Sequence, residues 1–203
     1  MKSINATLYL CLMLGIGVLT GCDDDDHDHD HDHSEEETIS QVVLVFTPTG
    51  DGDVVTATWL DADGEGAGTP SIDPINLVEG KTYELSMTLV NTLADPDEDK
   101  TSEIQGEDDE HMFFFEFSEG YFSDPTGDGN VDNRGDDVNY NDQDDNGNPL
   151  GLSTTWTAGG QSDISGEFTV ILKHQPGLKT ATSGSDVGGT DVTATFPLNI
   201  VRP

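Results

Sequence analysis

The residues of this chain whose types and spacing suit chemistry lie first in a short tract near the N-terminus. From residue 23 to residue 33 the sequence has four aspartates, followed by histidines that alternate with aspartates. In an extended chain this period of two places the imidazoles on one side and the carboxylates on the other. Imidazole is a good ligand for zinc and copper, and carboxylates neutralise the charge of the ion. The tract therefore predicts capture of Zn or Cu by His27, Asp28, His29, Asp30, His31, Asp32 and His33. A hydrophilic stem without a metal role is the alternative interpretation.

Two other histidines stand at the ends of expected strands. His111 closes the acidic run of residues 107–111, and His174 closes the strand expected over residues 166–174. If these two ends lie side by side, His111, His174 and Glu110 can form a second metal site with three ligands and an open position. The alternative is a pair of surface or hydrogen-bonded histidines.

Two acidic loops carry oxygen ligands at alternate positions, as calcium loops do. These candidate calcium ligands are Asp61, Asp63, Asp142, Asp144 and Asn146. The second loop begins like an EF-hand loop, but Ser153 stands at its twelfth position, where a bidentate glutamate is needed. Asn146-Gly147 between two strands also favours a hairpin with a type I′ turn, which we prefer here.

A third acidic stretch, residues 124–137, is expected to be a long surface insertion. Its sequence Asp128-Gly-Asn130-Val-Asp132-Asn133 is another partial calcium loop. Long loops of this kind gain most from a bound ion, so calcium is a further candidate ligand.

Charge and missing motifs exclude other classes of function. The 41 acidic and 7 basic residues give a formal net charge of −34, which repels nucleic acid and attracts cations. The sequence contains no Gly-x-Ser-x-Gly, His-Glu-x-x-His or P-loop motif. We therefore expect neither a nucleic-acid partner nor enzymatic activity.

The elements that must position these residues are expected to be short β-strands. Apolar residues alternate with polar ones with a period of two, and Gly, Pro, Asn and Asp clusters separate the runs. The runs cover residues 39–47, 54–62, 82–91, 112–118, 151–157, 166–174 and 191–201, with 138–142 as an eighth. They predict an all-β domain over residues 38–203, folded as an antiparallel two-sheet sandwich that is Ig-like in outline. The expected core contains Phe46, Trp59, Leu85, Leu89, Phe115, Phe168, Val170 and Phe196.

The N-terminal segment has the features of a secretory signal. Residues 1–21 contain Lys2 followed by a mostly apolar run that is too short for a transmembrane helix. Leu19-Thr-Gly-Cys22 resembles the lipobox of bacterial lipoproteins, and this resemblance implies acylation of Cys22 after cleavage. Cys22 would then be the single cysteine of the mature chain, without a thiol for a disulfide. Residues 22–37 follow as an acidic stalk, which we expect to be disordered because it has almost nothing to bury.

The whole chain resembles small envelope lipoproteins of Bacteroidota. The resemblance combines the lipobox and the acidic stem with Asp109-Glu-His111-Met-Phe-Phe and Leu172-Lys-His174-Gln-Pro-Gly. Some members of that group carry an automatic type 1 periplasmic-binding fold label, but that fold needs βαβ units that this chain lacks. The resemblance implies a lipid-anchored protein of the bacterial envelope, at the outer membrane, that assists an outer-membrane metal receptor. The alternative function is a structural or adhesive β-sandwich on an acidic stalk, stabilised by calcium.

Overall fold

The computed structural model describes residues 37–64 and 66–203. The expected signal segment, Cys22 and the Asp/His tract lie outside these residues. The described part forms two β-sheets, which confirms the prediction of an all-β, two-sheet sandwich. Among the described residues, no helix combines the length and apolar character needed to cross a membrane.

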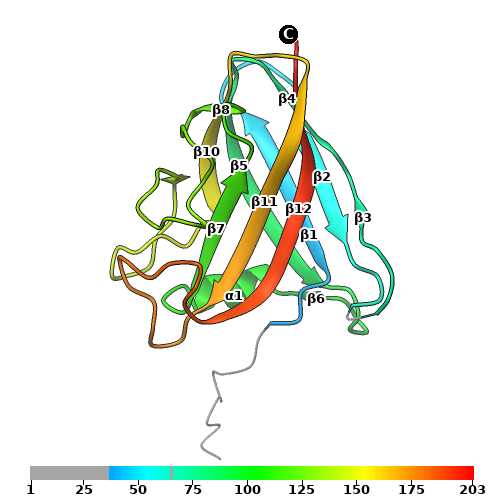
Figure 1. Cartoon of the computed structure of the whole chain (residues 1–203). Coiled ribbons are helices and arrows are strands. Elements are labelled where there is room, and N and C mark those ends of the chain that lie inside the picture. Colours follow the sequence, from blue (N-terminus) through cyan, green and yellow to red (C-terminus); the bar gives the residue numbers. More distant parts are fainter. Residues whose placement is uncertain (1–36, 65) are drawn as a thin grey trace, which may run out of the picture. The chain divides into compact units, whose positions relative to one another are not determined.

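The elements follow one another along the chain in the order of their labels in Figure 1. The strands are β1 (Gln41–Pro48), β2 (Val55–Leu60), β3 (Ser71–Ile72), β4 (Ile75–Val78), β5 (Thr82–Asn91), β6 (Glu98–Asp99), β7 (His111–Phe117), β8 (Phe122–Asp124), β9 (Asn139–Tyr140), β10 (Ser153–Ala158), β11 (Ile164–His174) and β12 (Gly189–Val201). A short helix of six residues, α1 (Thr101–Gly106), precedes β7.

The strands divide between the sheets by a simple order. The larger sheet has the order β3-β2-β1-β5-β10-β8, with β6 added to β5 and β9 added to β10. The smaller sheet has the order β4-β12-β11-β7. The pairs are antiparallel, except that β4 runs parallel to the end of β12. Every long run with a period of two became a strand, whereas β3, β4, β6 and β8 span two to four residues and are too short to show a period.

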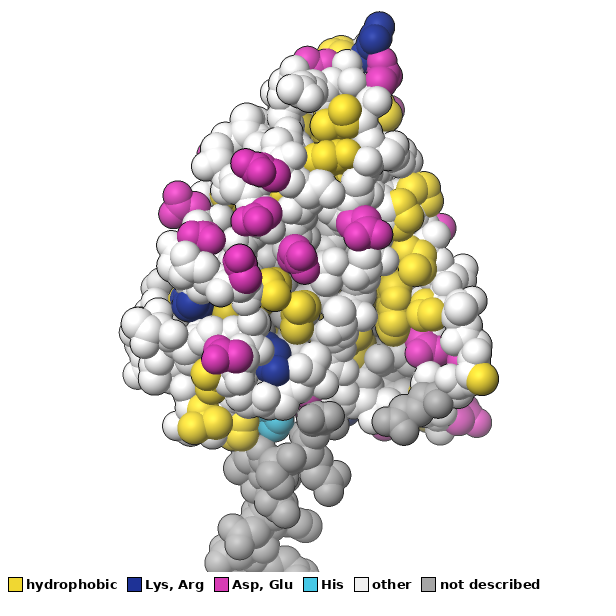
Figure 2. All heavy atoms as spheres, in the orientation of Figure 1, with side chains coloured by type: hydrophobic (Ala, Val, Ile, Leu, Met, Phe, Trp, Pro, Cys, Tyr) yellow, Lys and Arg dark blue, Asp and Glu magenta, His cyan; other side chains and the backbone are white. Residues whose placement is uncertain are grey.

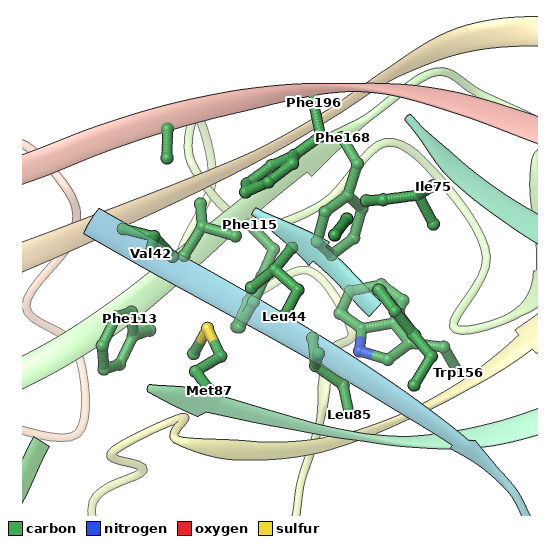
Figure 3. Packing of buried hydrophobic residues seen from close by; sticks show 14 of the residues in the cluster. Val42, Leu44, Ile75, Leu85, Met87, Phe113, Phe115, Trp156, Phe168 and Phe196 are labelled. Atoms are coloured by element: carbon green, nitrogen blue, oxygen red, sulfur yellow. The ribbon is translucent and has the colours of Figure 1, made fainter. Parts of the chain in front are cut away.

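The core lies between the two sheets because alternate side chains of each strand point inward. In β1, Val42, Leu44 and Phe46 are fully buried, whereas Val43 and Val45 between them are only half-buried. Trp156 of the larger sheet meets Phe168 of the smaller sheet edge to face, with ring centroids 5.1 Å apart. Figure 3 shows side chains of β1 and β5 packed against those of β7, β11 and β12.

The predicted core is correct except at Trp59. This side chain points to the same side of β2 as buried Ala57, but it is only partly buried against the core. The reason is its place near the end of β2, where only the short β3 lies outside it and Trp59 lines a cavity. A strand pattern shows which face a residue occupies, but it cannot show how far the opposite sheet extends over that face.

One end of the sandwich gathers segments that are far apart in the sequence. Figure 1 shows α1, the start of β7, the end of β11 and the start of β12 together at the lower end of the domain. In the described chain His111 is the first residue of β7 and His174 is the last residue of β11. The fold thus brings both candidate histidines to the same edge.

Candidate metal centre

The register of β7 and β11 places the two histidines opposite each other. His111 pairs with His174 in the antiparallel ladder, and paired side chains lie on the same face. Their imidazole rings stack with centroids 4.6 Å apart and planes inclined by 6°. The ends of the two strands therefore lie side by side, which was the condition for the second metal site predicted from the sequence.

The segment before β7 and the loop after β11 bury both histidines. His111 is 0% exposed and His174 is 5% exposed. After β11, the Gln175 N–H donates to the Glu110 carbonyl at 2.6 Å, and the buried Gln175 side chain donates to the Gly184 and Val187 carbonyls. These contacts fold the loop between β11 and β12 over the ends of the strands. In the view of Figure 2 the histidine colour is accordingly a small patch at the lower end of the domain.

The Nε2 atoms of the two rings face carboxylates. His111 Nε2 lies 3.6 Å from Asp191 Oδ2, and His174 Nε2 lies 3.5 Å from Glu110 Oε2. Within the described residues, both Nε2 atoms and Glu110 Oε2 are buried without a hydrogen-bond partner. Buried polar atoms of native proteins are almost always satisfied, so this group calls for a ligand.

The separations fit two ligands of one ion better than they fit hydrogen bonds. A tetrahedral zinc ion with bonds of about 2.1 Å to nitrogen and oxygen holds its ligand atoms about 3.4 Å apart. A hydrogen bond between nitrogen and oxygen is shorter, at about 2.9 Å. Glu107 supplies another carboxylate, because its ligand atom and those of His111 and His174 lie within 4.8 Å of one another.

Local chemistry prepares His111 as a ligand. Its Nδ1 lies 3.1 Å from the Glu107 carbonyl oxygen, a contact that fits an N–H donor on Nδ1 and leaves the lone pair on Nε2. Burial lowers the pKa of His111 to about 4, and the charges of His174 and Lys179 act in the same direction. The imidazole is therefore neutral at neutral pH, which is the form that binds metals.

Asp191 is the member of this group that sequence reasoning missed. It lies in β12, next to β11 in the sheet, and its side chain is fully buried. Its Oδ1 accepts a hydrogen bond of 2.9 Å from the Glu37 backbone N–H. No motif surrounds it in the sequence, and in the structure it lies at a register shift of β12 against β11, between Thr190, opposite Lys173, and Val192, opposite Leu172.

A buried ion pair supports the loops around the centre. Lys179 Nζ lies 3.3 Å from Asp144 Oδ2, both side chains are fully buried, and Nζ also donates to the Asp108 carbonyl. Burial would raise the pKa of Asp144, but hydrogen bonds from Asn148 and the charge of Lys179 hold it below 3.8. The pair joins the loop after β11, the loop before β10 and the segment that leads into β7.

The predicted calcium residues use their oxygens within their own loops. Asp142 accepts hydrogen bonds from the Gly151 and Ser153 N–H groups at 2.7 and 3.0 Å. Asp144 Oδ1 accepts hydrogen bonds from the Asn146 and Asn148 N–H groups at 2.9 and 2.8 Å. These contacts favour the turn between β9 and β10 over an ion, and calcium at Asp142, Asp144 and Asn146 stays a prediction.

That turn differs from the expected type I′. A type I′ turn requires a positive φ at both central residues. Gly147 has a φ of +82°, but Asn146 is not among the described residues with a positive φ. The Gly147 N–H donates to the Asp144 carbonyl instead. The preferred turn is present, and Gln143 and Pro149 form an antiparallel bridge across it, but its type I′ geometry is wrong because the Asp144 carboxylate accepts two N–H groups and fixes another backbone conformation.

The other acidic positions are separate from the histidines in their contacts. In the loop after β2, Asp63 Oδ2 accepts from the Gly68 N–H at 3.0 Å, and Asp61 Oδ1 accepts from the Asp63 N–H at 3.4 Å. In the insertion before β9, exposed Asp128, Asp132 and Asp136 bring carboxylate oxygens within 4.8 Å of one another. This second group overlaps the partial calcium loop expected there and adds Asp136 to it.

Comparison with known proteins gives no relative from which a function follows. No family model, no curated protein and no solved structure matches the chain. Membership of a lipoprotein group stays a prediction from the sequence.

Proposed function

We propose that this protein binds a divalent transition metal, zinc or copper, as a lipid-anchored protein of the bacterial cell envelope. The observation that supports this most is the stacked, buried pair of His111 and His174, whose Nε2 atoms lack hydrogen-bond partners and face carboxylates. The Asp/His tract adds ligands of the same chemistry and would collect ions with lower selectivity. The expected partner is an outer-membrane metal receptor that exchanges ions with it.

The ligand set favours holding an ion over catalysis. His111, His174 and the Glu107 carboxylate would supply three ligands within reach of one ion, and Glu110 and Asp191 each place a further carboxylate beside one Nε2 atom and would help to neutralise a divalent charge. Catalytic zinc sites keep one position for water, whereas closed sites of four ligands hold the metal for structure or storage. The burial of His111 and His174 agrees with a closed site.

Zinc titration of two complementary variants tests the proposal. In one variant His174 becomes Gln, and in the other the tract histidines His27, His29, His31 and His33 all become Asn. Calorimetry should show that His174→Gln removes a tight equivalent of zinc, whereas the tract variant loses only weaker equivalents. Zinc at 100 times its Kd should add about 2.7 kcal/mol to the stability of the tract variant. Tight binding that persists in His174→Gln would refute the buried centre.

A second candidate function rests on the exposed carboxylates of the insertion. Asp128, Asp132 and Asp136 lie close enough to share one cation, which supports a calcium-stabilised structural or adhesive module. Calcium should then raise the melting temperature of the protein, and Asp132→Asn should abolish that rise while zinc binding persists. A melting temperature that does not change when calcium is added would refute this second function.

A further inference from the structure

Glu37, the first residue that the structure describes, contacts Asp191 of the candidate centre. The Glu37 backbone N–H donates to Asp191 Oδ1 at 2.9 Å, while its carboxylate lies 3.0 Å from Lys100 Nζ. The side chains of Glu37 and Lys100 are only 13% and 15% exposed. Lys100, just before α1, also contacts Glu103 at 2.8 Å and Glu98 at 3.8 Å. Although burial lowers the pKa of Lys100, its bonds to Glu103 and Glu37 raise it above the ordinary value.

A cavity of about 480 Å³ opens beside this contact. Its walls come from residues 37–40 before β1, the end of β2 and the loop after it, the turn after β5 and the start of β12, and they include both Glu37 and Asp191. Asp61 contributes another carboxylate and Trp59 an aromatic wall. Acidic walls of this kind concentrate cations from solution.

The centre needs a path to solvent, and this cavity shares one of its ligand residues. A buried metal site requires an access route. Asp191 lines the cavity, but its side chain is fully buried. The wall between cavity and centre is therefore closed in this structure. Glu37 belongs to that wall, and it precedes β1, so it is held by Asp191 and Lys100 and not by a strand ladder.

We propose that Glu37 is a latch that controls metal exchange: held by Lys100, it fixes Asp191, and the ion passes between the centre and the cavity when this contact opens. This inference rests on the proposed function, because it assumes that the centre binds a metal. The latch sets the rate of exchange, whereas the histidines and carboxylates of the centre set the affinity.

The experiment measures zinc exchange in the full chain with the four tract histidines replaced by Asn, so that the centre alone is observed. Stopped-flow transfer of zinc to a coloured chelator gives the release rate, and a competition titration gives the affinity. Loss of one partly buried ion pair should make release about fivefold faster in Glu37→Gln and in Lys100→Met. Glu98→Gln is the matched control, because Glu98 contacts the same lysine but no centre residue, and its release rate should change less than twofold.

The cavity is tested by filling it. Thr193 lines the cavity on β12, whereas Thr195 lies two residues along the same face and is not among the lining residues. Thr193→Trp should slow uptake and release together without changing the affinity, and Thr195→Trp should change neither rate.

The outcomes separate the two proposals. If the chain with the four tract histidines replaced by Asn does not bind zinc tightly, the proposed function fails. If zinc binds tightly but Glu37→Gln releases it at the unaltered rate, or no faster than Glu98→Gln, the latch is refuted. If Thr193→Trp leaves both rates unchanged, the cavity is not the path.

Discussion

The neutral, buried state of His111 makes metal-free stability depend on pH in a calculable way. Its pKa is lowered from 6.5 to about 4 by burial, so the unfolded chain binds a proton more readily than the folded one. At about 1.4 kcal/mol per pKa unit this shift is worth about 3 kcal/mol. That stability is present above pH 6.5 and is lost as the pH falls from 6.5 toward 4.

Urea unfolding of the metal-free protein between pH 7.5 and pH 4.5 measures this loss. The integrated linkage predicts that about 2.5 kcal/mol disappears over the interval. Asp99 and Asp144 contribute little there because their pKa values lie below 3.8. Asp142, whose pKa burial raises, acts in the opposite direction but equally in both proteins of the comparison.

His111→Gln provides the comparison, because it removes the titrating group and keeps a polar side chain of similar length. The variant is expected to be less stable at neutral pH and to have a flatter profile, so that the two proteins converge toward pH 4.5. Parallel profiles would refute the reasoning, since they would show that His111 is charged equally well in the folded and the unfolded protein.

Two further perturbations test the supports of the site by urea unfolding at neutral pH. Lys179→Met removes the cation that pairs with the fully buried carboxylate of Asp144 and should cost about 3–5 kcal/mol. The control Lys81→Met, at a half-buried lysine that donates to the Asp51 carbonyl, should change stability by no more than about 0.5 kcal/mol, and an equal loss in both variants would contradict a role of the ion pair. Gly127→Ala should cost about 1–2 kcal/mol through backbone strain alone, because its φ is +97° and its Cβ would have no atom within 4 Å. Gly129→Ala, with a φ of +104°, should cost more because its Cβ would clash with the Phe115 carbonyl oxygen of β7, and equal losses would contradict that close approach.

The long strands were predictable because burial on one face imposes a visible period. In β12 the residues from Val192 to Ile200 alternate between buried and more exposed, and the sequence shows the same alternation. Strands of two residues carry no such signal, and α1 is too short to display a helical period. The parallel pairing of β4 with β12 depends on contacts between distant segments, which no local pattern encodes.

The candidate centre was predictable only in part. His111 and His174 were visible as strand ends, and Glu110 was visible as the neighbour of one of them. Their meeting depends on the register of β7 against β11, and the position of Asp191 depends on a register shift between β11 and β12. Register follows from matching whole faces of strands, so it appears only when the sheet is assembled.

The spacing of the centre along the chain has a consequence for how long the protein survives. His111 and His174 come from strands about 60 residues apart in sequence, so an ion shared between them would cross-link the chain in the manner of a removable disulfide. Closing a loop of this length removes unfolded-state entropy worth roughly 4 kcal/mol. The loaded protein would therefore resist unfolding and proteolysis, whereas the empty protein would be degraded first, and the amount of the protein would follow the supply of metal.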